Sequence, residues 1–144
     1  MTSPRSRSPR GRVFFDSSAF LATLNLADEH HEEARGILAR IATEHLAGVT
    51  TNFVIAEAHA LILTRMNRSA AMDFLHGMER SEIQVIRVQE SDETGARKIV
   101  YQYDDKNFSL TDAISFAVTD RLGIGVAFAF DRNFVQYGFE VIRP

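Results

Sequence analysis

One short apolar run that ends on a carboxylate constrains this sequence more than any other feature. Residues 13–15 read Val-Phe-Phe, Asp16 follows them directly, and the hydroxyl residues Ser17 and Ser18 come next. In an open α/β sheet, the groups that carry chemistry lie at the carboxyl ends of the strands, where each strand gives way to a helix. This stretch therefore predicts a buried strand that presents Asp16 at such an edge, with Ser17 or Ser18 as the cap of the helix that follows.

The remainder of the chain alternates short apolar runs with longer segments of helical periodicity. Further strands are expected at 47–50, 83–88, 126–130 and 139–142, and helices are expected after Asp28, Thr51, Ser69, Ser91 and Ser109. Such alternation predicts a parallel sheet covered by helices on both faces. Right-handed crossovers then place every strand's carboxyl end at one edge. No composition break suggests a second domain, so residues 13–144 are expected to form a single domain.

Composition restricts the chemistry that this edge can carry. The chain has no cysteine, which excludes disulfides and thiolate metal sites, so any metal must bind oxygen or imidazole. No run approaches the ~18 apolar residues of a membrane span, and no secretory signal is evident. We therefore expect no membrane association and a cytoplasmic location. Residues 1–12 form a basic leader rich in Ser, Pro and Arg, which we expect to be flexible; a non-specific RNA contact is the alternative.

Four acids lie where neither a plain core nor a plain surface would place them. Asp16 and Asp131 each follow a predicted buried strand, and Glu57 lies within a helix, 52–66, that is otherwise apolar nearly all round and is expected to be buried. Asp112 is the last residue of Ser-Leu-Thr-Asp, which has the form of a helix capping box. Each has a structural alternative: Asp16 and Asp112 could cap helices, Asp131 could open a turn, and Glu57 could pair with a buried arginine.

The predicted topology directs several of these acids to the same edge of the sheet. Clustered carboxylates repel one another and raise one another's pKa, and a divalent cation removes that strain. With oxygen ligands only, Mg²⁺ or Mn²⁺ is favoured over zinc. Such an ion can polarise a phosphate and lower the pKa of a bound water.

Four sequence blocks together resemble PIN domains in order and spacing: VFFDSSAF, TNFVIAEAHAL, DDKNFSLTDAISFAV and AFAFDRNF. The resemblance spans residues 13–144. It implies a three-layer α/β/α fold with a five-stranded parallel sheet in the order 3-2-1-4-5, and a Mg²⁺- or Mn²⁺-dependent ribonuclease. It also implies that the catalytic and metal-binding residues are Asp16, Glu57, Asp112 and Asp131, with Ser17 and Thr111 as supporting hydroxyls. Arg132 and Asn133 directly follow Asp131 and are further candidates for phosphate contact.

The single-domain size and the SLTDA block further resemble the toxin half of VapBC-type toxin–antitoxin pairs. That resemblance implies a homodimer inhibited by a small antitoxin, often through an arginine inserted into the acidic groove. Two alternatives share the fold: a free-standing PIN ribonuclease in RNA processing or turnover, and a catalytically inert interaction module. Phosphoacceptor and phosphatase folds also place Asp at strand ends, but Ser18 occupies the position where the phosphatase needs a second acid.

The histidines and the basic residues complete the set of candidates. His30 and His31 lack the His-Glu-x-x-His spacing of a zinc site and are expected to lie in a solvated helical turn. The acidic balance argues against tight non-specific binding of nucleic acid. RNA would be held through the metal and a few of the basic residues Arg65, Arg68, Arg97, Lys98 and Arg132.

Overall fold

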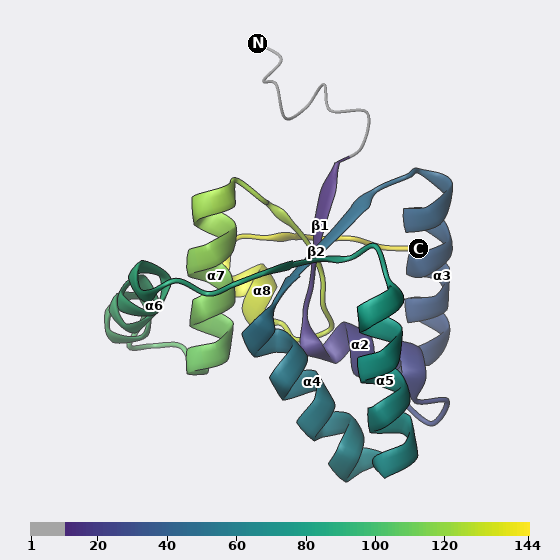
Figure 1. Cartoon of the computed structure of the whole chain (residues 1–144). Coiled ribbons are helices and arrows are strands. Elements are labelled where there is room, and N and C mark those ends of the chain that lie inside the picture. Colours follow the sequence, from purple (N-terminus) through teal and green to yellow (C-terminus); the bar gives the residue numbers. More distant parts are fainter. Residues whose placement is uncertain (1–10) are drawn as a thin grey trace.

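A parallel five-stranded sheet forms the centre of the molecule (Figure 1). The computed structural model describes residues 11–144, and the predicted leader lies almost entirely outside the described residues. The strands are β1 (Arg12–Phe15), β2 (Ala47–Thr51), β3 (Gln84–Ile86), β4 (Val126–Phe128) and β5 (Glu140–Val141). All neighbours pair in parallel, in the order β3-β2-β1-β4-β5. The expected fold class and strand order are confirmed.

Helices cover both faces of the sheet. They are α2 (Ser17–Leu24), α3 (His31–Thr43), α4 (Asn52–Arg65), α5 (Arg68–Arg80), α6 (Glu90–Gln102), α7 (Leu110–Leu122) and α8 (Asn133–Tyr137). Figure 1 shows α6 and α7 on one side of the sheet and α3 and α5 on the other. Within residues 11–144, no helix combines the length and the apolar character that a membrane crossing requires.

The core is built around β1 because this strand lies in the middle of the sheet, between β2 and β4. Residues 13–15 are almost fully buried. The ring of Phe15 packs edge-on against Phe128 of β4 at 5.0 Å between centroids, and Phe14 stacks on Phe134 of α8 at 6.2 Å. The hydroxyl of Thr50 donates to the carbonyl of Phe15 at 2.9 Å. These contacts fix the carboxyl end of β1, and with it the position of Asp16.

Helix starts differ from expectation at three places, each by a few residues. The N-cap of α2 is Asp16 rather than a serine, since its side chain accepts a hydrogen bond from Ser18 N. Asn67 caps α5 through Ala70 N, and a capping box between Gln89 and Asp92 opens α6. At α2 and α5 a polar side chain just upstream of the expected cap accepts from a free helical N–H group, and at α6 the Asp92 carboxylate accepts from Gln89 N.

Two further expectations about β4 and α4 were wrong. Strand β4 ends at Phe128 instead of Phe130, because Phe130 N donates to the hydroxyl of Ser18 rather than to a strand. Helix α4 is not buried all round: Ala56 and Ala60 are exposed and Leu63 is 43% exposed. Some apolar side chains of α4 are therefore left uncovered by the core.

Candidate active site

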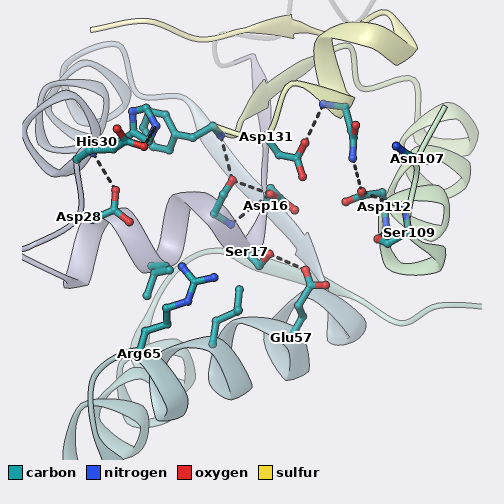
Figure 2. A pocket seen from close by; sticks show the side chains of 16 residues that line it. Asp16, Ser17, Asp28, His30, Glu57, Arg65, Asn107, Ser109, Asp112 and Asp131 are labelled. Atoms are coloured by element: carbon teal, nitrogen blue, oxygen red, sulfur yellow. Dashed lines mark hydrogen bonds and ion pairs between the residues drawn. The ribbon is translucent and has the colours of Figure 1, made fainter.

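An open cleft of about 560 Å³ lies at the carboxyl edge of the sheet (Figure 2). All four predicted acids line it, although they come from four separate segments of the chain. The complete lining is Asp16, Ser17, Ser18, Leu21, Asp28, Glu29, His30, Glu57, Leu61, Arg65, Asn107, Ser109, Asp112, Phe130, Asp131 and Asn133. The sheet topology thus produces the convergence expected from strand ends at one edge.

Asp16 is both a helix cap and a cleft carboxyl. Its Oδ2 accepts hydrogen bonds from Ser18 N at 3.2 Å and from Ser18 Oγ at 2.7 Å. The residue is only 3% exposed, and burial raises the pKa of its carboxyl to about 7, with repulsion from Asp112 adding to the effect. The bonds from Ser18 favour the ionised form but offset only part of the burial penalty. Near neutral pH this carboxyl is therefore divided between its two protonation states.

Glu57 faces the cleft from the opposite wall, on α4. Ser17 Oγ donates to its Oε1 at 2.5 Å, which joins the first turn of α2 to α4. Burial raises the pKa of Glu57, and repulsion from Asp112 and Asp131 adds to it, while the Ser17 bond opposes the rise. The acid that interrupts an apolar helix is thus explained by a polar cleft rather than by a buried arginine.

Asp112 and Asp131 are held together by Asn133. The Asn133 side-chain amide donates to Asp112 Oδ2 at 2.9 Å, and its backbone N–H donates to Asp131 Oδ1 at 2.8 Å. Asp112 also completes the predicted capping box with Ser109 at the start of α7. Burial is the main cause that raises the pKa of Asp112, and repulsion from Asp131 contributes. Asp112 therefore caps α7 and also lines the cleft.

The donor chemistry of this cleft suits a hard divalent cation, because it offers carboxylate oxygens and no thiolate. Among residues 11–144, however, no three acid or histidine side chains are arranged as a ready-made ion site. Each carboxylate is held by a hydrogen bond from its own neighbour: Ser18, Ser17 or Asn133. The four carboxyls therefore line one cleft without forming a single ion site among residues 11–144.

Two predicted supporting residues lie outside the cleft. Thr111 lines an adjoining hollow with Asn52, Phe53, Ala56 and Glu57. Arg132 is exposed and does not line the cleft. Their supporting roles stay predictions.

Several cleft residues were not predicted as site residues, and one expectation was wrong. Ser18 bridges Asp16 and Phe130, and its place two residues after the cap was the available sequence signal. His30 lines the cleft, and His31 is buried with Nδ1 2.8 Å from Ala22 O. The two histidines therefore do not form the solvated turn that the sequence suggested.

Comparisons with known proteins agree with this geometry. A sequence model of the PIN domain matches residues 13–140. The chain is 30% identical over 132 residues to the 23S rRNA-specific endonuclease VapC20 of Mycobacterium tuberculosis, covering 92% of this chain and 98% of the relative.

Solved structures give the same result. The crystal structure of M. tuberculosis VapC20, described as a sarcin–ricin loop cleaving toxin, superposes with a TM-score of 0.86 at 30% identity, over 92% of this chain and 99% of that one. VapBC2 from Rickettsia felis, bound to a promoter DNA fragment, has a TM-score of 0.67 at 10% identity, over 91% and 97%; at that identity it shows the fold alone. With a matching family model and a relative of this similarity, the chain belongs to the PIN domain family.

Proposed function

We propose that this protein is a metal-dependent endoribonuclease that acts as the toxin of a toxin–antitoxin pair. The observation that carries the proposal is the convergence of Asp16, Glu57, Asp112 and Asp131 on one cleft. Three of these carboxyls have a raised pKa. Membership of the PIN family and the 30% identity to an rRNA endonuclease support it. We take the four acids as the catalytic and metal-binding residues.

The cation would be Mg²⁺ or Mn²⁺, held by these four acids. When bound, it would polarise the scissile phosphate and favour ionisation of a water. Ser17 orients Glu57, and Asn133 orients Asp112 and Asp131. Because the pKa of Asp16 lies at about 7, a bound cation would favour the ionised form of this carboxyl near neutral pH.

The overall reaction is hydrolysis of an RNA phosphodiester. The oxygen of water bonds to phosphorus, the bond to the 3′ oxygen breaks, and a proton passes to that oxygen. The products are a 5′-phosphate and a 3′-hydroxyl. The sarcin–ricin loop of 23S rRNA is the first substrate to test, because VapC20 is described as cleaving it.

The decisive test uses purified, partner-free protein and a sarcin–ricin loop oligoribonucleotide, with Mn²⁺, Mg²⁺ or excess chelator. We expect cleavage with either cation, none with chelator, and none from Asp16→Asn. A 5′-phosphate-dependent exonuclease should degrade the downstream product. Cleavage in excess chelator would contradict the metal proposal. Intact RNA under every condition, with rRNA and tRNA tested as well, would indicate an inert interaction module.

We also propose a small antitoxin partner, a homodimer and a cytoplasmic location. The support is the resemblance to VapBC-type toxins together with apolar side chains that the described core leaves uncovered, notably Leu26 at 82% exposure and Leu63 at 43%. Light scattering after size-exclusion chromatography measures the oligomeric state. Co-expression with any short reading frame immediately upstream tests for the antitoxin. A monomer that retains no partner and still cleaves RNA would indicate a free-standing PIN ribonuclease.

A further inference from the structure

The cleft continues beyond the four acids into a region with a different lining. Glu57, Leu61 and Arg65 are spaced four residues apart and face the cleft from one side of α4. At 1.5 Å per residue, Arg65 lies about 12 Å beyond Glu57 along the helix axis. Figure 2 shows Arg65, Asp28 and His30 at the end away from Asp112 and Asn107. We call this end the side arm; it comprises Leu21, Asp28, Glu29, His30, Leu61, Arg65 and Phe130.

A stacked ring pair forms one wall of the side arm. His30 lies on Phe130 with ring centroids 4.5 Å apart and planes inclined by 5°. Phe130 in turn packs edge-on against Phe128, a fully buried core residue, at 5.9 Å. The His30 side chain is 40% exposed, and carboxylate oxygens of Glu29 and Glu33 lie 3.5 and 3.8 Å from its ring nitrogens. The outer ring is therefore accessible, oriented and anchored to the core.

An arginine without a partner faces the arm from the opposite wall. Arg65 is the only Lys or Arg among the cleft-lining residues within 11–144. No hydrogen bond or ion pair joins its guanidinium to any residue in that range, and the residue is exposed. A guanidinium is weakly hydrated and presents a planar set of donors that matches a phosphate. This guanidinium is thus available to bind an incoming phosphate.

We propose that the side arm is a nucleotide subsite. The exposed face of His30 stacks on an RNA base next to the scissile phosphodiester, and Arg65 pairs with the phosphate of that nucleotide. The carboxylates of Asp28 and Glu29 accept hydrogen bonds from N–H groups on the base edge. The proposal rests on the ribonuclease function proposed above and adds how the substrate strand is held.

The accessible aromatic face of His30 favours a nucleic-acid base over other occupants of the side arm. Aromatic platforms bind bases of any identity, because every base has a π-face. At the His30 end of the arm, the neighbouring carboxylates of Glu29 and Glu33 disfavour a phosphate or an acidic peptide, whereas a base brings hydrogen-bond donors without negative charge. An antitoxin segment is the competing occupant, and the experiment separates the two.

The test measures binding without turnover, in the Asp16→Asn background. Fluorescence anisotropy follows a fluorescein-labelled sarcin–ricin loop oligoribonucleotide and a set of copies, each with one abasic nucleotide near the cleavage site. We expect His30→Ala to weaken binding about 5- to 150-fold, the range of base stacking on an aromatic ring. His30→Phe should restore binding, since it keeps the ring. The side chain of His30 makes no helix-capping hydrogen bond, so His30→Ala removes no cap.

Arg65→Gln should weaken binding of the intact RNA, and Arg65→Lys should retain part of the affinity. Two matched controls lie on α5, are exposed and do not line the cleft: His76→Ala and Arg80→Gln. Both should bind as the parent does. Thermal unfolding of each variant verifies the fold.

Each outcome supports or overturns the subsite. If His30→Ala causes no further loss of affinity for one abasic copy, the missing base of that copy is the stacked base, and the subsite is supported. Unchanged RNA binding by His30→Ala overturns it and leaves the ribonuclease proposal intact if the wild type cleaves. If His30→Ala loses the same affinity for intact RNA and for every abasic copy, no base stacks on His30 and the subsite is overturned. Loss of affinity for a co-purified antitoxin but not for RNA assigns the arm to the protein partner. Failure of the wild type to cleave or bind any RNA overturns both proposals.

Discussion

Replacing Asp16 by asparagine should change how the stability of the protein depends on pH. Asp16 is buried, and burial raises the pKa of its carboxyl from 3.8 to about 7. Between those two pH values the folded protein binds more protons than the unfolded chain, so the free energy of unfolding falls as pH rises and levels off above the folded pKa. At about 1.4 kcal/mol per pKa unit, the full window is worth about 4 kcal/mol. About 3 kcal/mol of it falls between pH 5 and pH 8.5.

Asparagine cannot ionise, so the free energy of unfolding of the Asp16→Asn variant does not include this fall with rising pH. Its free energy of unfolding, minus that of the wild type, should therefore rise by about 3 kcal/mol from pH 5 to pH 8.5. The difference between the two proteins is more informative than either curve, since Glu57 and Asp112 titrate in both. Asn at this position keeps an oxygen that can accept from Ser18 N, so the α2 cap is retained.

Urea unfolding in excess chelator measures this difference. The chain has no tryptophan, so circular dichroism at 222 nm is the appropriate signal. Asp73→Asn, an exposed carboxylate on α5, is the control and should differ little from the wild type at both pH values. If Asp16→Asn and the wild type differ by the same amount at pH 5 and pH 8.5, the carboxyl is not destabilised by burial, and the electrostatic account of the cleft is wrong.

Three further measurements test the cleft and the fold. Mn²⁺ at a hundred times its dissociation constant should raise the free energy of unfolding of the wild type by about 2.7 kcal/mol at pH 8, measured as a gain in melting temperature. The gain should be smaller at pH 5.5, where protons compete with the cation for the carboxylates. Asp112→Asn should remove most of the gain. Ser109→Ala removes the cap of α7 and should lower the free energy of unfolding by about 1 kcal/mol in denaturant titrations, whereas Ser91→Ala, on exposed α6 surface, should have little effect. Phe116→Ala opens the fully buried aromatic cluster and should cost about 3–5 kcal/mol; a loss below 1 kcal/mol would contradict the described core.

Local patterns were sufficient for a parallel sheet covered by helices and for singling out the four acids, whereas the strand order came from the resemblance to PIN domains. The alternation of apolar runs and periodic helices predicted a parallel sheet because each element has a characteristic period and length. Asp16 follows β1 directly and Asp131 lies three residues after the end of β4, and parallel strands end at one edge, so their convergence needed no tertiary information. The Ser109–Asp112 box was also readable, because its hydrogen bonds span three residues.

Contacts between distant segments were decided only by the tertiary structure. Ser17 reaches Glu57 across 40 residues, and Ser18 meets the backbone of Phe130 across 112. These pairs depend on how helices cross and which rotamers fit, and no local period encodes either. Helix α4 is a further example. Its sequence gives the positions of the apolar side chains, but only the packing of neighbouring elements determines which of them are buried.

The sequence by itself thus determined the strand that ends on Asp16, the parallel sheet and the edge at which the acids meet, because chain direction and side-chain periodicity are local properties. The tertiary structure alone decided the pKa of Asp16, which rises to about 7 because surrounding elements bury its carboxyl. It also decided the stack of His30 on Phe130, since two loops a hundred residues apart in the chain meet only when the fold is complete.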